Sequence, residues 1–443
     1  MGSIRQLVKN LFDRKPKTVH EKVSLQEVFG ISKEIPKYTY VDRSNLDNTF
    51  AYLLKAQRHI VIHGASKQGK TILRRKILPD DQVVVIQCTP NLTLENIYIQ
   101  ILEQLDVQIP KELRDTTTNS VQHSVGGEGG IPLVKVKADA TATESVEQTV
   151  TSIPVGISTN NLQFVSKEII EHNKRIVIED FHYLPEAEQR KLAFDLKALW
   201  DMGAFLIVVG VWAEQNLLTY YNGDLSGRIE ELDIRWTDAE LELVLGKGEK
   251  VLNICFSDDI RKQLISDANQ NVGLLQRIAE KFCYESSILE SQPIENGTKN
   301  ILGDIQALDR ARGKICQEED VRYRQFSDAI QRGFKGYEES ELKVYRHILR
   351  IFVEATDEDI KTGIHRDNLL LLVQKLEPRV RLSDLSAALN KINKLQVDRR
   401  ISPLVISYNT ASSSRKLELI DREFLFYRKY GNPSWSWIDE EGE

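Results

Sequence analysis

The sequence predicts an α/β fold, in which a parallel sheet with crossover helices is followed by a run of helices and then by a C-terminal winged helix. Three observations support this prediction. Between about 56 and 236, short runs rich in Val and Ile alternate with helical patterns, which is typical of strands buried on both faces. Residues 237–290 and most of 300–360 have helical patterns alone. The segment after 340 has the order helix, helix, helix, two strands, helix.

Composition narrows the possible functions. The chain has 443 residues, of which 41% are hydrophobic and 28% charged, and its formal net charge of −6 restricts any nucleic-acid site to a local patch. Its four cysteines lie far apart, without a C-x-x-C pair or zinc spacing, so we expect reduced thiols. No apolar run approaches the ~20 residues that a membrane span needs, and no signal-peptide core is present. We therefore expect no membrane span and a cytoplasmic protein.

A phosphate-binding motif follows the first predicted strand, His59–His63. Its spacing is G-x-x-x-x-G-K-T, and a helix is predicted to begin near Lys70. Glycines permit the dihedrals that point backbone N–H groups at a phosphate, and the helix N-terminus adds partial positive charge. Lys70 would reach the β- and γ-phosphates, and the Thr71 hydroxyl would ligate Mg²⁺. The motif predicts ATP and Mg²⁺ binding by Gly64, Ala65, Ser66, Lys67, Gln68, Gly69, Lys70 and Thr71.

Two carboxylates end the third predicted strand, Arg175–Ile178. Adjacent acids at the end of a buried strand are costly without a cation, which favours a catalytic role over a helix cap for Asp180. By position, Glu179 is expected to be the acid on the metal side and Asp180 the one that polarises the attacking water. Because the side chain of Asp is shorter than that of Glu, we expect hydrolysis to be slow.

Three segments depart from the alternating pattern. Residues 1–17 form a basic amphipathic pattern, which either packs on its own domain or docks on a partner or an anionic surface. The Ser-, Thr- and Gly-rich stretch near 115–161 predicts an inserted hairpin or flexible loop between the second strand and the third. It either contacts a ligand or a neighbouring subunit, or is merely solvated. The aromatic and acidic end, with Trp435 and Trp437, is expected to be disordered or to lie on the surface.

Taken together, these motifs resemble those of the AAA+ ATPases, nearest to the initiator and origin-recognition type and to the related STAND signalling ATPases. The resemblance covers roughly 36–290. Tyr40, Val41 and Arg43 stand where such proteins carry a short segment that closes over the adenine. Arg228 stands in a segment like the one that carries the family's arginine finger, a residue that would reach the γ-phosphate of a neighbouring subunit.

The same resemblance indicates where two sensor residues would lie. Gly210 and Trp212 stand near the end of the strand that usually carries the first sensor, and Asn216 is the first amide after it. The segment Asn271–Arg277 resembles a lid helix, in which Gln276 stands at the usual position of the second sensor and Arg277 is the candidate for that role.

The C-terminal segment adds a candidate DNA-binding surface. Residues 340–430 hold 17 Lys and Arg against 12 Asp and Glu, an excess in an otherwise acidic chain. In a winged helix, the third helix and the wing meet the major groove and the adjacent phosphates. Winged helices also dock proteins, so both readings stay open. The candidate DNA contacts on the third helix and the wing are Asn390, Lys391, Asn393, Lys394, Arg399, Arg400, Arg415 and Lys416.

Two functions fit these observations. The first is an ATP-controlled switch that forms homo-oligomers and assembles on double-stranded DNA. The second is a STAND-type sensor or scaffold, for example in bacterial antiviral defence, which oligomerises with ATP and activates a separate effector protein. The domains expected under both functions are an N-terminal segment at 1–35, an AAA+ core at 36–236, a helical lid and linker at 237–335, a winged helix at 336–430 and an acidic tail at 431–443.

Overall fold

The computed structural model describes residues 22–107, 161–212, 216–294, 299–334, 341–408 and 415–431, together with Pro433 and Trp435. The N-terminal basic pattern at 1–17, the insertion near 115–161 apart from Asn161, residues 409–414 of the predicted wing, and Trp437 lie outside the described residues. The chain divides into two units that interleave along the sequence. The first consists of Met1–Phe50, His63–Ile77 and Asp233–Glu443, and the second of Ala51–Ile62 and Leu78–Leu232.

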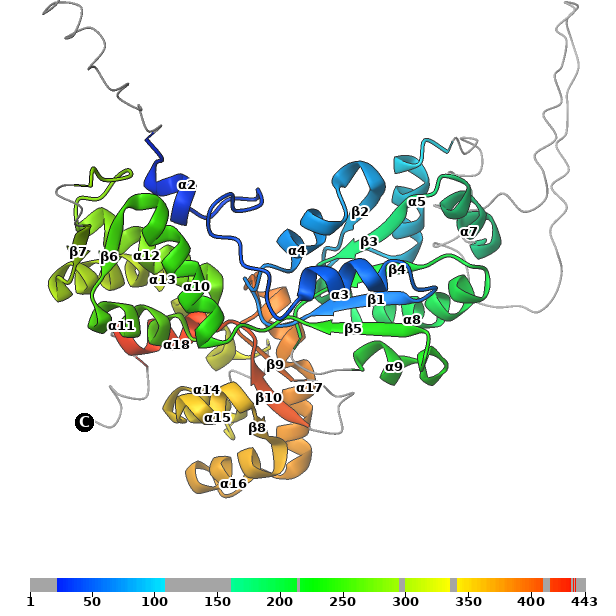
Figure 1. The fold of residues 1–443 in the computed structure, drawn as a ribbon. Helices are drawn as coiled ribbons and strands as arrows, with labels where there is room; N and C mark the ends of the chain where they lie inside the picture. Colours follow the sequence, from blue (N-terminus) through cyan, green and yellow to red (C-terminus); the bar gives the residue numbers. More distant parts are fainter. Residues whose placement is uncertain are drawn as a thin grey trace, which may run out of the picture. The chain divides into compact units, whose positions relative to one another are not determined.

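A five-stranded sheet has the strand order β2-β3-β4-β1-β5 (Figure 1). The registers of β2 with β3, β3 with β4 and β4 with β1 are all parallel. Every residue of β1 and β4 is buried, as expected of Val- and Ile-rich runs covered on both faces. The α/β class predicted from the sequence is therefore confirmed. The strands are β1 (His59–His63), β2 (Val83–Gln87), β3 (Arg175–Glu179), β4 (Leu206–Val209) and β5 (Ile229–Asp233).

The helices of the second unit pack on one another beside this sheet. α5 (Leu94–Gln104) contacts β2, and α5, α7 (Leu162–Glu171) and α8 (Glu186–Asp201) contact each other (Figure 1). Two of these helices, α5 and α7, have N-cap side chains. Thr93 and Asn161 accept hydrogen bonds from backbone N–H groups of the first turns of α5 and α7, respectively. A short helix, α9 (Leu217–Tyr221), packs on α8.

The first unit begins with helices around a two-stranded parallel sheet of β6 and β7. Capping boxes start α2 and α10, at Ser24 with Glu27 and at Thr237 with Glu240. The elements in chain order are α2 (Leu25–Phe29), α3 (Leu46–Leu53, which extends into the second unit), α4 (Lys70–Ile77), α10 (Asp238–Leu252), β6 (Ile254–Phe256), α11 (Asp258–Ala268), α12 (Val272–Glu285), β7 (Asn300–Leu302) and α13 (Ile305–Arg332).

The C-terminal elements follow the predicted order, with one additional short helix and one additional strand. β9 and β10 form a hairpin, and β8 pairs with β10 in the antiparallel sense. The additional elements, α15 and β8, come before the second of the predicted helices. The full set is α14 (Val344–Glu354), α15 (Asp357–Thr362), β8 (Ile364–His365), α16 (Arg366–Leu376), α17 (Leu382–Asp398), β9 (Ile406–Tyr408), β10 (Lys416–Leu419) and α18 (Glu423–Tyr430).

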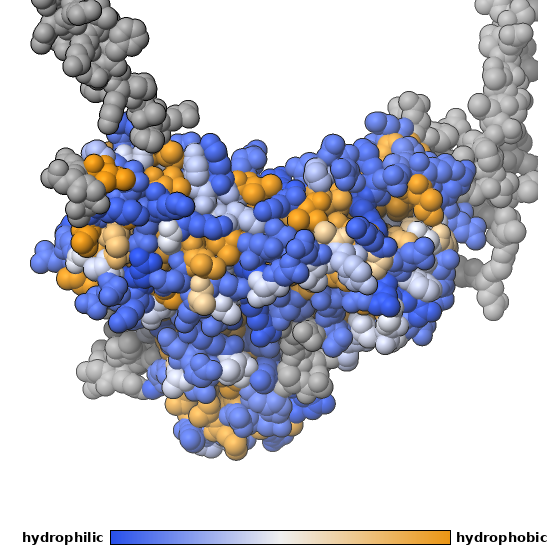
Figure 2. All heavy atoms as spheres, in the orientation of Figure 1, coloured by the Kyte–Doolittle hydropathy of each residue, from blue (hydrophilic) through white to orange (hydrophobic). Residues whose placement is uncertain are grey.

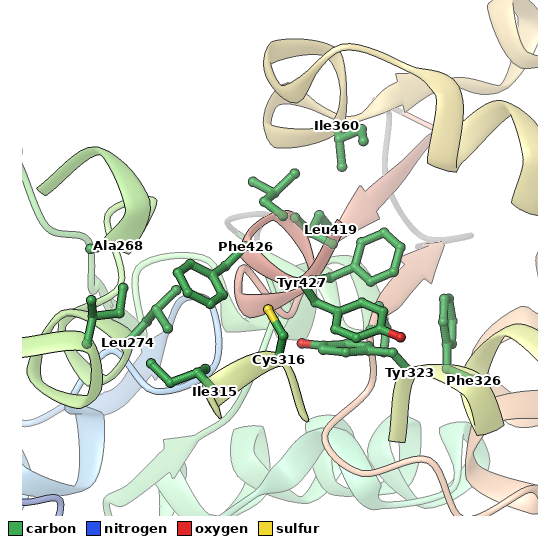
Figure 3. Close-up of a cluster of buried hydrophobic side chains, with 14 of the residues drawn as sticks. Ala268, Leu274, Ile315, Cys316, Tyr323, Phe326, Ile360, Leu419, Phe426 and Tyr427 are labelled. Carbon is green, nitrogen blue, oxygen red and sulfur yellow. The ribbon is translucent and has the colours of Figure 1, made fainter. Parts of the chain in front are cut away.

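α13 and α18 bring much of this unit's apolar core together. The rings of Tyr323 on α13 and Tyr427 on α18 lie 4.7 Å apart between centroids (Figure 3). Phe326 of α13 packs on Phe424 of α18. Trp435 is buried and contacts Phe424 as well, with ring centroids 6.3 Å apart. The expectation that Trp435 is disordered or on the surface is therefore wrong. Burial of its indole in this aromatic cluster outweighs its position near the end of the chain.

Hydrophilic side chains dominate the face shown in Figure 2, with apolar side chains gathered in separate patches. Among the described residues, no helix is long and apolar enough to cross a membrane. All four cysteines lie among the described residues, and none of them is in a disulfide. Within the same described ranges, no cluster of three or more His, Cys, Asp or Glu side chains has the arrangement of a metal site.

Candidate nucleotide-binding site

The loop from Gly64 to Gly69 connects the end of β1 to α4, which begins at Lys70 as predicted. Gly64 and Gly69 have φ angles of 138° and 80°, which residues other than glycine adopt only with strain. A Cβ on Gly64 would lie 2.5 Å from the Ile234 carbonyl oxygen, so this position also requires the absence of a side chain. The loop has the glycine geometry that the sequence motif predicts.

Lys70 is buried and folds back over the loop. Its Nζ donates hydrogen bonds to the carbonyl oxygens of Gly64 and Ala65, at 3.1 and 2.6 Å. The side chain of Thr71, the next residue, is exposed on the first turn of α4. The ammonium group is thus positioned inside the loop, where it could donate hydrogen bonds to the phosphates of a nucleotide.

The carbonyl of Gln68 is held from two directions. Arg43 Nη1 donates to it at 2.9 Å, and Trp236 Nε1 donates to it at 3.1 Å. The guanidinium of Arg43 also lies over the Trp236 ring, 4.3 Å from its centroid, and burial lowers the pKa of Arg43. The guanidinium of Arg43 is therefore bonded to the loop and packed on Trp236.

Tyr40, another residue of the predicted adenine segment, contacts α4. The Tyr40 hydroxyl donates to Asp47, and Lys76 of α4 lies over its ring at 3.8 Å. Burial, and then the hydrogen bond to Asp47, raise the pKa of Tyr40. Val41 is buried.

The N-terminus of α12 approaches the same loop. Asn271 Nδ2 donates to the Ser66 carbonyl at 3.4 Å, and Gln68 Nε2 donates to the Gln270 carbonyl at 3.0 Å. A Cβ on Gly273 would lie 3.1 Å from Cβ of Lys67, which is tighter than ordinary contact. The first turn of α12 is therefore packed against the phosphate loop.

The C-terminal elements contact the loop as well. The Ser66 amide donates to the Ile420 carbonyl at 3.2 Å, and Lys67 forms an ion pair with Glu423 of α18 at 2.5 Å. The Glu423 side chain is 1% exposed, and burial, followed by the nearby Asp421, raises its pKa. An ion pair to such a buried carboxylate fixes Lys67, which has a φ of 59°, in one position.

Arg277, the candidate second sensor, takes part in this charge cluster. It pairs with Glu319 at 2.5 Å and Glu318 at 2.7 Å, and lies 3.7 Å from Glu423. Burial alone would lower the pKa of Arg277, but the hydrogen bonds to Glu318 and Glu319 outweigh it and raise the pKa. Its guanidinium is committed to protein carboxylates here.

A cavity of about 500 Å³ opens beside the loop. Lys67 and Gly69 of the loop and Ile72 of α4 line it, so it adjoins the place where phosphates would bind. The size and the mixed lining are typical of a small-molecule pocket. The remaining lining is mainly apolar, with a few polar groups, and includes Ile31, Pro36, Thr39, Val41, Trp236, Val272, Gln276, Arg277 and Glu319.

The predicted catalytic acids lie at the carboxyl end of β3, in the second unit. Glu179 is the last residue of the strand and is buried, and it pairs in register with Gln87 of β2. Asp180 follows in the left-handed region, with φ 54°, and its carboxylate accepts a hydrogen bond from the Gln87 side chain. Asp180 stands at a helix N-cap position but makes no side-chain capping bond. The roles of the two acids in hydrolysis stay predictions.

The region expected to hold the first sensor is filled by an aromatic side chain. A Cβ on Gly210 would lie 2.0 Å from the Trp212 ring, so glycine is needed there to admit the indole. Trp212 packs edge-on against Phe181, with centroids 5.9 Å apart. Asn216 starts α9 in the left-handed region, and its backbone amide donates to Glu231.

Arg228, the candidate arginine finger, contacts its own subunit. Its guanidinium lies over the Trp200 ring at 4.7 Å and donates to the Asp224 carbonyl. To reach a neighbouring subunit, the side chain must leave this cation–π contact. Its role in assembly stays a prediction.

The candidate DNA-contacting side chains differ in exposure and in whether they are already bonded to other protein groups. Asn390, Lys391 and Arg400 are exposed, and Lys394 is exposed but pairs with Asp398 on the same helix. Arg399 Nη2 donates to the Gly333 carbonyl at the end of α13, and Lys416 Nζ donates to the Thr362 carbonyl. Asn393 is hydrogen-bonded to the backbone of Tyr408. Arg415 is exposed at the start of β10.

Several residues of this site carry no signal in the sequence. Trp236, Ile420 and Glu423 contact the loop from positions far along the chain, and the sequence assigns no role to any of them. Asn271 begins the segment that resembles a lid helix, but nothing in the sequence indicates its hydrogen bond to Ser66. Glu423 lies in the last helix beside several aromatic residues, and the sequence gives no indication that it pairs with Lys67, 356 positions earlier.

No family model and no curated protein matches the chain. The fold is similar to those of many solved structures, among them the following three. A Walker-type ATPase of Pyrococcus abyssi is 13% identical, with a TM-score of 0.49, over 92% of this chain and 100% of its own. The ORC1 protein of Aeropyrum pernix, solved in complex with DNA, is 10% identical, with a TM-score of 0.41, over 94% of this chain and 98% of its own.

The third is a STAND signal-transduction ATPase of Pyrococcus horikoshii with a tetratricopeptide repeat sensor. It is 12% identical, with a TM-score of 0.36, and the match covers 93% of this chain but 45% of that one. These proteins are of the kinds that the sequence motifs resemble. All three TM-scores lie below 0.5.

Proposed function

We propose that the chain is an ATPase that acts as a nucleotide-controlled switch. One observation carries the proposal: three consecutive loop residues are bound by distant parts of the chain. Ser66 and Lys67 contact Ile420 and Glu423, and Gln68 contacts Arg43, Trp236 and Gln270. A nucleotide that changes the loop would change these contacts, and so act on α12 and on the C-terminal elements.

The loop supplies groups of the right chemistry for a nucleoside triphosphate. Backbone N–H groups, the N-terminus of α4 and Lys70 would hold the phosphates. The Thr71 hydroxyl is an oxygen ligand of the kind that suits Mg²⁺, which is usually bound by one or two protein oxygens together with substrate phosphates rather than by a protein cage. Mg²⁺ would neutralise charge on the phosphates during transfer to water. The cavity beside the loop would take the base and the ribose.

Replacing Lys70 tests this proposal. In Lys70→Ala, ATP affinity should fall by roughly 100-fold, because charge-assisted hydrogen bonds to the phosphates are lost. Titration with a fluorescent ATP analogue measures the affinity, and sedimentation with ATP and with ADP measures any nucleotide-dependent change in size. Lys262→Ala, which removes an exposed lysine on α11, is the matched control. ATP affinity that is the same in Lys70→Ala and in the control would refute the phosphate site.

We propose that the C-terminal elements form a winged helix that grips double-stranded DNA. The element order and the three-stranded antiparallel sheet support this assignment. Ser383, Ala387, Asn390 and Lys394 are exposed along α17 at helical spacing. A face with small and amide side chains fits a groove, and Lys391, Lys394, Arg400 and Arg415 would neutralise phosphates around it.

A second candidate function, a scaffold that recruits an effector protein, is favoured by one observation. Leu371 and Leu382 are 62% and 41% exposed, and Leu376 is 37% exposed, all on α16 and α17. Exposed leucines on adjacent helices are more typical of protein docking than of phosphate contacts. Failure to bind duplex DNA, in the experiment described in the Discussion, would favour this candidate.

A further inference from the structure

Two of the uncharged polar side chains that line the cavity beside the phosphate loop, Thr39 and Gln276, are hydrogen-bonded to each other. Gln276 projects from α12, and its Nε2 donates to Thr39 Oγ1 at 3.1 Å. Val41, Ile72 and Trp236 are part of the same lining. A side-chain amide has an oxygen that accepts hydrogen bonds and an NH₂ group that donates them. Which of the two faces the cavity decides what kind of ligand group the amide can bind.

The orientation of this amide is fixed by its neighbours. The Thr39 hydroxyl donates its only proton to the Val28 carbonyl at 3.1 Å. Val28 lies in the last turn of α2, where carbonyls lack partners within the helix, so this bond satisfies a group that would otherwise be orphaned. Thr39 Oγ1 can then only accept. The atom of Gln276 that faces it must be the NH₂ group, which leaves Oε1 as the acceptor that remains for a ligand.

We propose that Gln276 is the residue that selects the base, and that it selects adenine. Adenine presents its N6 amino group, a donor, where guanine and hypoxanthine present an oxygen, an acceptor. Oε1 of Gln276 accepts a hydrogen bond from the N6 amino group of adenine and repels the oxygen at position 6 of guanine or hypoxanthine. The inference rests on the proposed nucleotide site, since it places the base in the cavity that adjoins the loop.

The charged groups around the cavity do not take over this role. Arg277 and Glu319 both line it, but they pair with each other at 2.5 Å. Arg43, which also lines it, donates to the Gln68 carbonyl and lies on Trp236. The commonest recognition of guanine uses an arginine or lysine that donates to O6 and N7. In the described lining, both arginines and Lys67, which pairs with Glu423, already hold protein groups. The uncharged amide is left to discriminate between the bases.

The experiment measures the affinities of the intact protein for ATP, GTP and ITP by competition against a fluorescent ATP analogue, with Mg²⁺. ITP differs from ATP in carrying the oxygen at position 6, without the additional amino group of GTP. One well-placed hydrogen bond to a base edge discriminates by roughly 10- to 100-fold. The wild type should prefer ATP over both competitors by a factor in this range.

Two variants separate the role of the amide from that of the pocket. Gln276→Met keeps the length and approximate volume of the side chain but removes the acceptor, so ATP should lose its advantage over ITP and GTP. Gln306→Met makes the same change at an exposed position on α13 and should keep the wild-type preference. Lys70→Ala should weaken all three nucleotides equally, because they share their phosphates.

The possible results distinguish a failure of the proposed nucleotide site from a failure of the proposed role of Gln276. If the wild type binds no nucleotide, the proposed nucleotide site fails, and the inference fails with it. If the wild type binds ATP, GTP and ITP alike, the nucleotide site stands and the role of Gln276 is overturned. A folded Gln276→Met protein that keeps the wild-type preference for ATP overturns it as well. Circular dichroism of each variant establishes that it is folded.

Discussion

At the scale of single residues, His59 shows how the fold sets a protonation state. The ring is fully buried at the start of β1, and both of its nitrogens are hydrogen-bonded to backbone groups. Nδ1 accepts from the Leu206 amide at 3.0 Å, so the proton is on Nε2, which donates to the Leu196 carbonyl at 2.8 Å. Burial lowers the pKa of His59 to about 4. The folded protein therefore holds this imidazole neutral.

The stability of the second unit should fall on acidification for this reason. The unfolded chain takes up a proton at His59 near pH 6.5, whereas the folded chain takes it up only near pH 4. The contribution is complete above pH 6.5 and is lost progressively as the pH falls to about 4, by about 3 kcal/mol. Urea unfolding at several pH values measures this loss. His59→Gln should flatten the profile, and the same change at the exposed His172 is the control. Equal slopes for the two variants would contradict the assignment.

At the scale of single elements, α10 carries two glycines in contrasting surroundings. A Cβ on Gly246 would have no heavy atom within 4 Å, apart from the helix's own backbone and chain neighbours. A Cβ on Gly248 would lie 2.1 Å from the tip of the Phe29 ring. Phe29 is fully buried in α2, so its ring has no free space into which to move. Gly248 is thus required where α2 packs on α10, and Gly246 is not.

Alanine at these two positions should have opposite effects. Gly246→Ala should raise the free energy of unfolding by up to about 1 kcal/mol, through helix propensity. Gly248→Ala should lower it by about 1–3 kcal/mol, because overpacking outweighs the same gain in propensity. Thermal and urea unfolding of the two variants measure the difference. The packing of α2 on α10 would be in doubt if both variants were stabilised.

At the scale of the whole molecule, the proposed function links the phosphate loop to a DNA-binding surface. The two lysines best suited to test this surface are Lys391 and Lys394, because both are exposed. Arg399 is less suitable, since it holds the Gly333 carbonyl at the end of α13 and its loss would disturb the fold. The choice of variants thus depends on contacts that only the structure displays.

Charge reversal at these lysines should weaken DNA binding. In the double variant Lys391→Glu and Lys394→Glu, duplex affinity should fall by roughly 10-fold or more and its salt dependence should become shallower, because fewer counterions are released. Fluorescence anisotropy at two salt concentrations measures both. A double variant at the exposed Lys250 and Lys262 makes the same change in charge on α10 and α11. ATP affinity should stay unchanged in both. Equal duplex affinity in the two variants would exclude this surface and favour protein docking.

The sequence by itself determined the local features of this protein. Strand and helix alternation follows from side-chain periodicity, and the loop before Lys70 follows from glycines at fixed spacing, so both were predictable residue by residue. The order of helices and strands after 340 was predictable for the same reason, apart from α15 and β8, which are too short to show a period.

Only the tertiary structure decided what surrounds the loop. The ion pair of Lys67 with Glu423, the two donors on the Gln68 carbonyl and the burial of Trp435 all join positions far apart in the chain. Periodicity reports which face of an element is buried, but not which distant side chain meets it there. The direction of the Gln276 amide depends in the same way on Thr39 and on the end of α2. Such contacts are fixed by packing, which a single sequence does not display.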